Sequence, residues 1–181
     1  MSKQLLIYFL TIILFISCKD DKQTSPTTDL NDNKSSAYIL ILEAKFSLND
    51  KFQIYYTDEE GAELSGENVI DMFVYGNAEM QKIEIPFPED VIPYKIRFDL
   101  GENNSQSVMS IKNISIKYKD KIVDGDNGKF QNYWTPNEAL KYDAANFVYN
   151  LSLVNGVHDP LMISNSNLED ELADLRPAIK E

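Results

Sequence analysis

Cysteine and histidine are almost absent from the 181-residue sequence, which has one of each, Cys18 and His158. One cysteine cannot close a disulfide within the chain, and it cannot supply the clustered thiolates of a structural zinc site. A hydrolase of the Ser-His-Asp type would depend on His158, but the sequence has no Gly-x-Ser-x-Gly elbow. We therefore expect His158, which precedes the turn-like pair Asp159-Pro160, to be a solvated loop residue.

Basic residues are also scarce. The sequence has 17 Lys and Arg against 29 Asp and Glu, which gives a formal net charge of −12. An acidic surface repels phosphate backbones and offers no basic stripe for them. We therefore expect no nucleic-acid partner, and anionic lipid headgroups are poor partners for the same reason. The sequence contains no phosphate-binding loop, and we expect no cofactor.

Long apolar runs are missing except near the start of the chain. Residues 5–16 are apolar apart from Thr11, and they follow the basic Lys3. This run is too short to span a bilayer, which needs about 20 residues, but it has the length of a signal-peptide core. It ends in Phe15-Ile16-Ser17-Cys18, with a small residue directly before the cysteine.

This ending resembles the lipobox of bacterial lipoproteins, although Phe15 stands where leucine is usual. The resemblance implies that the Cys18 thiol is acylated and that residues 1–17 are a signal peptide removed just before it. Several acyl chains, palmitate among them, hold a protein on a membrane durably, whereas a single chain does so only marginally. The alternatives are an ordinary secretory signal with an incidental cysteine and an uncleaved anchor.

The residues after Cys18 contain a candidate for a second localisation signal. Lys19-Asp20-Asp21 resembles the short signal that sends lipoproteins of the Bacteroidota to the outer face of the outer membrane. The resemblance implies a lipid-anchored protein on the cell surface; a lipoprotein facing the periplasm is the alternative. Residues 19–36 have Leu30 as their one aliphatic side chain, too little apolar surface to drive folding. Residues 18–36 are therefore expected to be the acylated cysteine and a flexible tether.

Residues 37–165 show the short alternating runs of an all-β domain. The cleanest is 94–100, where every second residue is apolar. In 108–118 the alternation slips near Lys112-Asn113, which predicts a β-bulge. The spacing of these runs predicts an antiparallel β-sandwich, for which we favour the jelly-roll form. The other expected strands are 38–42, 45–48, 52–56, 69–75, 80–85, 129–134, 146–154 and 161–163.

The tail, residues 166–181, has a helical pattern instead. Leu168, Leu172 and Leu175 recur at the spacing of one helix face, Asn167 is a candidate N-cap and Pro177 is a stop. The sequence therefore predicts a short C-terminal helix, which either packs on the sandwich or frays in solvent.

The strongest aromatic candidate for a ligand site surrounds Trp134, the one tryptophan of the sequence. Neighbours on a strand point to opposite faces, so either Tyr133 or Trp134 should be exposed. An exposed ring can stack on a sugar, and the amides of Asn132 and Asn137 suit sugar hydroxyls. The alternative is that Trp134 is a core residue, which would remove the best candidate of a glycan site.

A second candidate site is the segment Asp124-Gly125-Asp126-Asn127-Gly128, which places two carboxylates in a tight loop. Asp124 and Asp126 resemble the start of a calcium loop, because calcium binds several hard oxygens. A third carboxylate and a distal bidentate glutamate are missing. Asp-Gly and Asn-Gly are also ordinary turn signals, so a plain turn is the alternative.

Residues 46–118 resemble the small β-sandwich modules that accompany bacterial polysaccharide-handling enzymes. The resemblance lies in 50–56 (DKFQIYY) and 96–101 (IRFDLG), and it implies a non-catalytic sandwich with glycan contact. Three functional hypotheses follow. The first is a surface-anchored glycan-binding module. The second is an accessory lipoprotein that docks a protein of an envelope complex, and the third is a small hydrolase built on a carboxylate pair or on His158.

Overall fold

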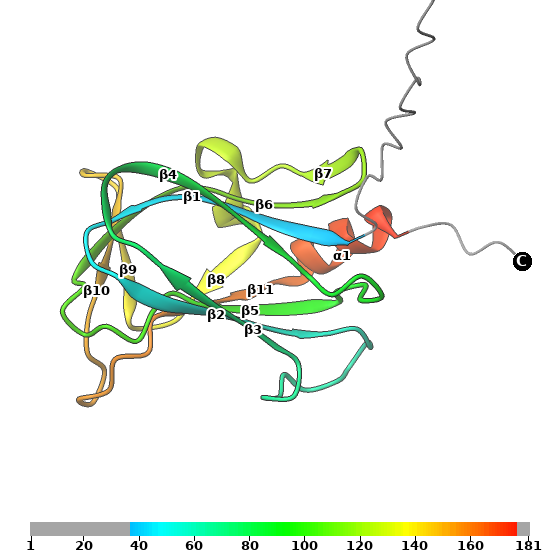
Figure 1. Ribbon diagram of the computed structural model, residues 1–181, viewed down its shortest axis with the longest axis horizontal. Helices are drawn as coiled ribbons and strands as arrows, with labels where there is room; N and C mark the ends of the chain where they lie inside the picture. The colour runs from blue at the N-terminus through cyan, green and yellow to red at the C-terminus, as the bar shows by residue number, and fades with distance from the viewer. Residues whose placement is uncertain (1–36, 177–181) are drawn as a thin grey trace, which may run out of the picture. The chain divides into compact units, whose positions relative to one another are not determined.

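Two antiparallel β-sheets face each other in the computed structural model, which describes residues 37–176 (Figure 1). The first sheet has the order β4 (Asn77–Pro86), β1 (Tyr38–Phe46), β6 (Val108–Tyr118), β10 (Val148–Leu151) and β9 (Leu140–Asp143), and β7 (Lys121–Val123) also pairs with β6. The second sheet has the order β3 (Val69–Val74), β2 (Asp50–Thr57), β5 (Lys95–Asp99), β11 (Leu161–Ser164) and β8 (Trp134–Pro136). This arrangement confirms the all-β sandwich; the jelly-roll form stays a prediction.

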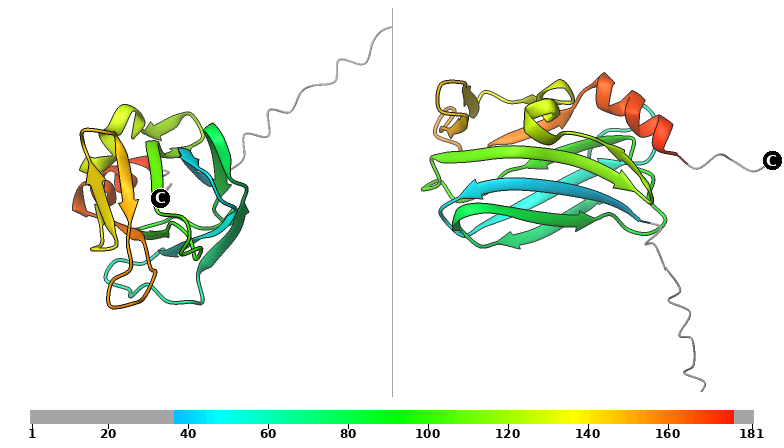
Figure 2. Two further views of the ribbon diagram at one scale, coloured as in Figure 1. Left: turned by 90° about the vertical axis from the view of Figure 1, so that its left-hand side faces the viewer. Right: turned by 90° about the horizontal axis from the view of Figure 1, so that it is seen from above.

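The core lies between the two sheets because alternate residues of each strand are apolar. On β1, Tyr38, Leu40 and Leu42 are buried on the inner side, and this face continues to Phe46. The ring of Phe46 lies 5.2 Å from that of Phe52 on the opposite sheet, so the two inner faces are in direct contact. Each such large apolar side chain contributes roughly 1.5–3 kcal/mol when buried. Figure 2 shows the two layers from the end and from above.

The predicted bulge in β6 is confirmed. Glu43 of β1 pairs with Asn113, and the next residue, Ala44, pairs with Ile111. Lys112 is therefore an extra residue opposite one step of β1, the geometry of a β-bulge. The bulge puts Lys112 on the exposed outer face, while Ile111 stays in the core.

Four expected strands are wrong in part. The runs 38–42 and 45–48 belong to one strand, β1, which ends at Phe46. Residues 129–134 are not a strand; 3₁₀-helix η1 (Asp126–Asn132) comes first, and β8 begins only at Trp134. Residues 146–154 contain only the short β10, because Phe147 adopts a left-handed φ of +56° that no strand accepts. The pattern also missed β7 and β9.

Helix α1 (Ser166–Leu175) confirms the C-terminal helix. Its N-cap is Asn165, not Asn167, because the Asn165 side chain accepts hydrogen bonds from two backbone nitrogens of the first turn. Leu168, Leu172 and Leu175 are buried, so the helix packs on the sandwich. It lies against β7 and β11, at the end opposite the β9–β10 hairpin (Figure 1). None of the helices in residues 37–176 is long and apolar enough to cross a bilayer.

Several expectations fall outside the described residues. These are the signal peptide of residues 1–17, the acylated Cys18 and the tether that continues to residue 36, and the end of the tail, residues 177–181. They stay predictions.

Candidate functional site

The best candidate for a ligand site is an open pocket of about 570 Å³ beside β6, which we call the aromatic pocket. Its volume falls within the range of about 300–1,000 Å³ that is common for small-molecule sites. The residues that line it come from β4, β6, η1, β9 and the β9–β10 hairpin: Met80, Ser110, Ile111, Lys112, Asn127, Gly128, Gln131, Tyr142, Asn146 and Phe147.

Two aromatic rings border this pocket, and both are exposed. Phe147 is 73% exposed, and Tyr142 on β9 is also largely accessible. The ring of Tyr142 lies 5.1 Å from the ring of Tyr149, which is buried and contacts the ring of Phe130 at 6.3 Å. Tyr142 is therefore supported from below by the core, while its outer side is open to a ligand.

Phe147 is held outward by its own backbone. Its φ of +56° lies in the left-handed region, where a bulky side chain is a genuine outlier. The preceding turn is organised by Asp143, whose carboxylate accepts hydrogen bonds from the nitrogen of Ala145 at 2.9 Å and from Asn146 Nδ2 at 2.7 Å. The Asn146 amide, followed by the local backbone, lowers the pKa of the Asp143 carboxyl, so this turn is held by an ionised side chain.

Helix η1 also contributes to the lining, and it begins with a second left-handed turn. Asn127 has a φ of +54° and Gly128 a φ of +83°. Asp126 fixes Asn127 by accepting hydrogen bonds from its backbone nitrogen at 2.8 Å and from its Nδ2 at 3.1 Å. Together with Gln131 and Asn146, Asn127 brings three side-chain amides to the lining, each with donor and acceptor atoms.

Lys112 is the basic residue among the lining side chains, and two carboxylates hold it. Its Nζ lies 2.8 Å from Glu43 Oε2 and 3.3 Å from Asp126 Oδ1. Glu43 first and Asp126 second raise the pKa of Lys112, so its ammonium group stays charged. All three side chains are partly exposed, which places the cluster at the edge of the pocket rather than in the core.

The residues expected to form a sugar site around Trp134 do not converge. Trp134 is 3% exposed, and its ring packs edge-on against Phe98 with centroids 6.5 Å apart. It is a core residue and presents no face to a ligand, which corrects the expectation built on it. Tyr133 is half-buried beside α1, and the backbone oxygen of Asn132 accepts hydrogen bonds from the side chains of Asn165 and Asn167.

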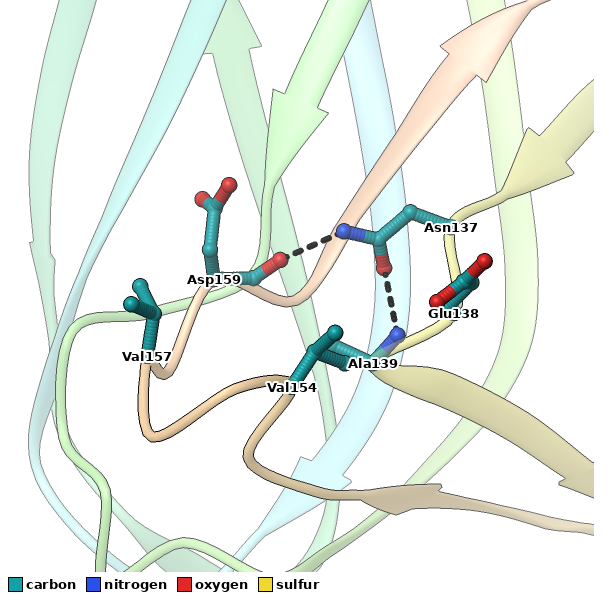
Figure 3. A pocket seen from close by; sticks show the side chains of 6 residues that line it. All are labelled: Asn137, Glu138, Ala139, Val154, Val157 and Asp159. Carbon is teal, nitrogen blue, oxygen red and sulfur yellow. Dashed lines mark hydrogen bonds between the residues drawn. The ribbon is translucent and has the colours of Figure 1, made fainter.

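Asn137 is occupied by the fold itself. Its Nδ2 donates to the backbone oxygen of Asp159 at 2.6 Å, and its Oδ1 accepts from the nitrogen of Ala139 at 3.1 Å (Figure 3). These bonds join the β8–β9 connection to the segment before β11. The hollow that Figure 3 shows has a volume of about 300 Å³, and Val154 and Val157 are among the residues that line it. His158 is half-buried, and its Nε2 has no hydrogen-bond partner among residues 37–176.

The two carboxylates of the expected calcium loop are also engaged. Asp124 Oδ1 accepts from the nitrogen of Asp126, and its Oδ2 pairs with Lys129 Nζ at 2.5 Å. Asp126 binds Asn127 and Lys112, as described above. Lys112 and Lys129 therefore pair with the carboxylates that a calcium ion would need. The described residues contain no group of three or more His, Cys, Asp or Glu side chains that could hold a metal ion. The turn interpretation fits this geometry.

Sequence reasoning missed the aromatic pocket because its residues come from separate segments. Phe147 lies within the expected strand 146–154, yet Asp143 and Asn146 before it are residues typical of turns. A bulky aromatic residue directly after such a turn is the sequence signal from which the aromatic pocket could have been predicted. No family model, no curated protein and no solved structure matches this chain.

Proposed function

We propose that this protein is a lipid-anchored, non-catalytic binding protein of the outer membrane that takes a glycan in the aromatic pocket at the cell surface. The observation that carries the proposal is Phe147, which is 73% exposed and held in a left-handed conformation. A non-glycine residue in this conformation costs on the order of 1–3 kcal/mol, and such residues cluster at functional sites. A hairpin that needed only a turn would use glycine or asparagine here.

The chemistry of the lining suits a sugar chain. Phe147 and Tyr142 offer apolar ring faces to the C–H side of a pyranose, and both rings lie on the same hairpin. Asn127 and Asn146 each donate one Nδ2 hydrogen within the protein. Their Oδ1 atoms and second Nδ2 hydrogens remain for sugar hydroxyl groups, together with the amide of Gln131. A few placed polar groups around an apolar surface are typical of small-molecule sites.

The lining residues also support a binding role rather than hydrolysis. They include no histidine and no carboxylate, and the two carboxylates at the edge of the pocket, Glu43 and Asp126, are both paired with Lys112. Glycoside hydrolysis normally requires two carboxyl groups flanking the bond that is cleaved. The proposal therefore assigns capture, not chemistry, to this pocket.

The position of the pocket supports capture at a surface. The chain enters the sandwich at Tyr38, which pairs with Tyr118, whereas Lys45 at the other end of β1 pairs with Ser110 of the pocket. Seven steps of a strand at about 3.3 Å each separate the two ends by roughly 23 Å. If the chain is anchored before residue 37, the pocket lies at the far end of the domain.

Phe147→Ala is the variant that tests this proposal, and Phe73→Ala is its matched control. Phe73 is 76% exposed on β3, outside the pocket. The full chain in mild detergent is tested on a glycan array and against whole polysaccharides. We expect specific binding that falls at least tenfold in Phe147→Ala and is unchanged in Phe73→Ala. Equal loss in both variants, or no glycan binding by a folded protein, would overturn the proposal.

A second candidate function, docking of an envelope protein, is favoured by a different observation. Phe73 and Tyr75 are both strongly exposed at β3, an edge strand of the second sheet. Open edge strands with apolar side chains pair readily with other chains. A photo-crosslinker at position 73 should then capture one defined envelope protein in cells, and the same crosslinker at position 147 should not.

A further inference from the structure

We infer that Glu43 and Asp126 set the charge selectivity of the aromatic pocket, so that it takes uncharged glycan chains and rejects uronates and sulfated sugars. This inference rests on the proposed function and names the class of glycan. Both carboxylates are paired with Lys112 Nζ, Glu43 at 2.8 Å and Asp126 at 3.3 Å.

A lysine in a sugar pocket would ordinarily favour anionic ligands. An ammonium group forms strong charge-assisted hydrogen bonds with carboxylates and sulfates. Lys112 already makes such contacts within the protein, because Glu43 lies beside it on β1 and Asp126 lies at the start of η1. An anionic sugar could use this lysine only by displacing one of the two carboxylates and leaving it without its partner.

The other charged groups around the pocket do not replace Lys112 as an anion site. Lys129 is paired with Asp124 at 2.5 Å, and Asp143 adds a negative charge under the Phe147 hairpin. Lys45 neighbours Ser110 in the sheet and has no ion pair among residues 37–176, but it is strongly exposed to solvent. Lys82 on β4, opposite Glu43 in the sheet, is likewise held by Glu84 at 2.6 Å, so Lys82, Lys112 and Lys129 are each paired with a carboxylate.

An uncharged sugar meets none of these difficulties. It needs only the ring faces and the amides of Asn127, Gln131 and Asn146, and it leaves the Lys112 cluster intact. A ligand that carries negative charge finds these lysines already paired and lies close to the carboxylates of Glu43, Asp126 and Asp143. Like-charge contacts of this kind are a main source of specificity between partners. The preference for neutral over anionic sugars should therefore weaken as salt screens the charges.

The experiment compares neutral and anionic polysaccharides on the full chain in mild detergent. The neutral probes are galactomannan, xyloglucan and mixed-linkage β-glucan, and the anionic probes are polygalacturonate, alginate and chondroitin sulfate. The wild-type protein should bind a neutral probe at least tenfold more tightly than any anionic probe at low salt. At high salt, the ratio of the affinity for neutral probes to the affinity for anionic probes should be smaller.

The variant that isolates the cause is E43Q/D126N, which frees Lys112. We expect the ratio of anionic to neutral binding to rise at least tenfold. Because Asp126 also holds Asn127, E43Q alone is measured beside the double variant and should shift this ratio in the same direction. The chain offers a matched control, D71N/E102Q, because Lys51 on the other sheet is held by Asp71 at 3.3 Å and Glu102 at 3.5 Å. This control removes the same charge far from the pocket and should leave the selectivity unchanged.

The outcomes separate the inference from the proposed function. If the wild type binds anionic probes as tightly as neutral ones, and Phe147→Ala abolishes both, the inference is wrong and the glycan site stands. If D71N/E102Q shifts the selectivity as much as E43Q/D126N, net charge acts and the assignment to Glu43 and Asp126 is wrong. If no probe binds in a Phe147-dependent way, both are overturned. If the double variant is unstable, E43Q is compared with E102Q instead, because each removes one carboxylate from a lysine that has two.

Discussion

Asp50 Oδ1 lies 2.8 Å from the backbone nitrogen of Glu102, across 52 residues of sequence. The same oxygen accepts from the nitrogens of Lys51 and Asn103, at 2.8 Å and 3.0 Å. One buried carboxylate thus joins the start of β2 to the loop after β5. This loop leads into β6 and so into the strand that lines the aromatic pocket.

Replacement of Asp50 by alanine should therefore destabilise the domain. The change leaves three backbone nitrogens without their acceptor, and a hydrogen bond to a charged group contributes about 1.5–3 kcal/mol. We expect the free energy of unfolding to fall by about 2–4 kcal/mol in urea titrations. Asn104→Ala, at an exposed position of the same loop, should change it by less than about 0.5 kcal/mol. Equal values for both variants would contradict this role of Asp50.

Gly101 is expected to be irreplaceable for two reasons. Its φ is +121°, and a Cβ atom there would lie 2.1 Å from Asp50 Oδ2. Gly101→Ala should reduce the free energy of unfolding by more than about 2 kcal/mol, because both the backbone and the Asp50 contact must shift. Gly66→Ala is the control, since nothing lies within 4 Å of a Cβ at that position. A Gly101→Ala protein as stable as the wild type would show that the loop rearranges freely.

Phe147→Gly should separate stability from binding. Glycine adopts the left-handed conformation without strain, a gain of roughly 1–2 kcal/mol that is partly offset by its larger backbone entropy in the unfolded chain. We expect a protein that is as stable as the wild type, or more stable by up to about 1 kcal/mol, and that has lost glycan binding. Phe147→Ala keeps the strain and should show no such gain. A clear loss of stability in Phe147→Gly would mean that the ring supports the fold.

High pH should destabilise the domain through its buried tyrosines. Burial, as the main cause, raises the pKa of both Tyr38 and Tyr149 to about 12. The folded state therefore retains phenolic protons that the unfolded chain has lost above about pH 10, so stability falls as pH rises from about 10 through 12. Thermal unfolding between pH 9 and 12 checks this. Tyr149→Phe should flatten the decline, and Tyr75→Phe, at an exposed position, should not.

Much of the fold could be predicted from the sequence because alternation is a local property. Every second residue of 94–100 is apolar, and β5 forms within that range. The slip at Lys112 was likewise visible, because a bulge changes the period of the pattern itself. By contrast, 129–134 has the aromatic residues typical of strands, Phe130, Tyr133 and Trp134, but they do not alternate, and the left-handed Asn127 and Gly128 precede η1 instead.

The candidate site could not be predicted in the same way, for a physical reason. Its residues meet only because β4, β6 and β9 are placed by the strand order, which a local pattern does not encode. Trp134 looked like the best ligand residue because the sequence cannot tell which of two neighbouring rings is buried. The exposure of Phe147 depends on one backbone angle in a turn. Local propensity is commonly overridden at positions that serve function.

Because Lys112 is the extra residue of the β6 bulge, its deletion would not change which residues of β6 face the core. Residues on both sides of Lys112 keep the same alternation that a strand of one residue fewer would have, with Ile111 and Ile114 facing inward in either case. Removing the single codon for Lys112 would therefore shorten the strand to a regular ladder and leave the core composition untouched. The cation at the edge of the pocket is therefore carried by a position that the hydrogen-bonded ladder itself does not need.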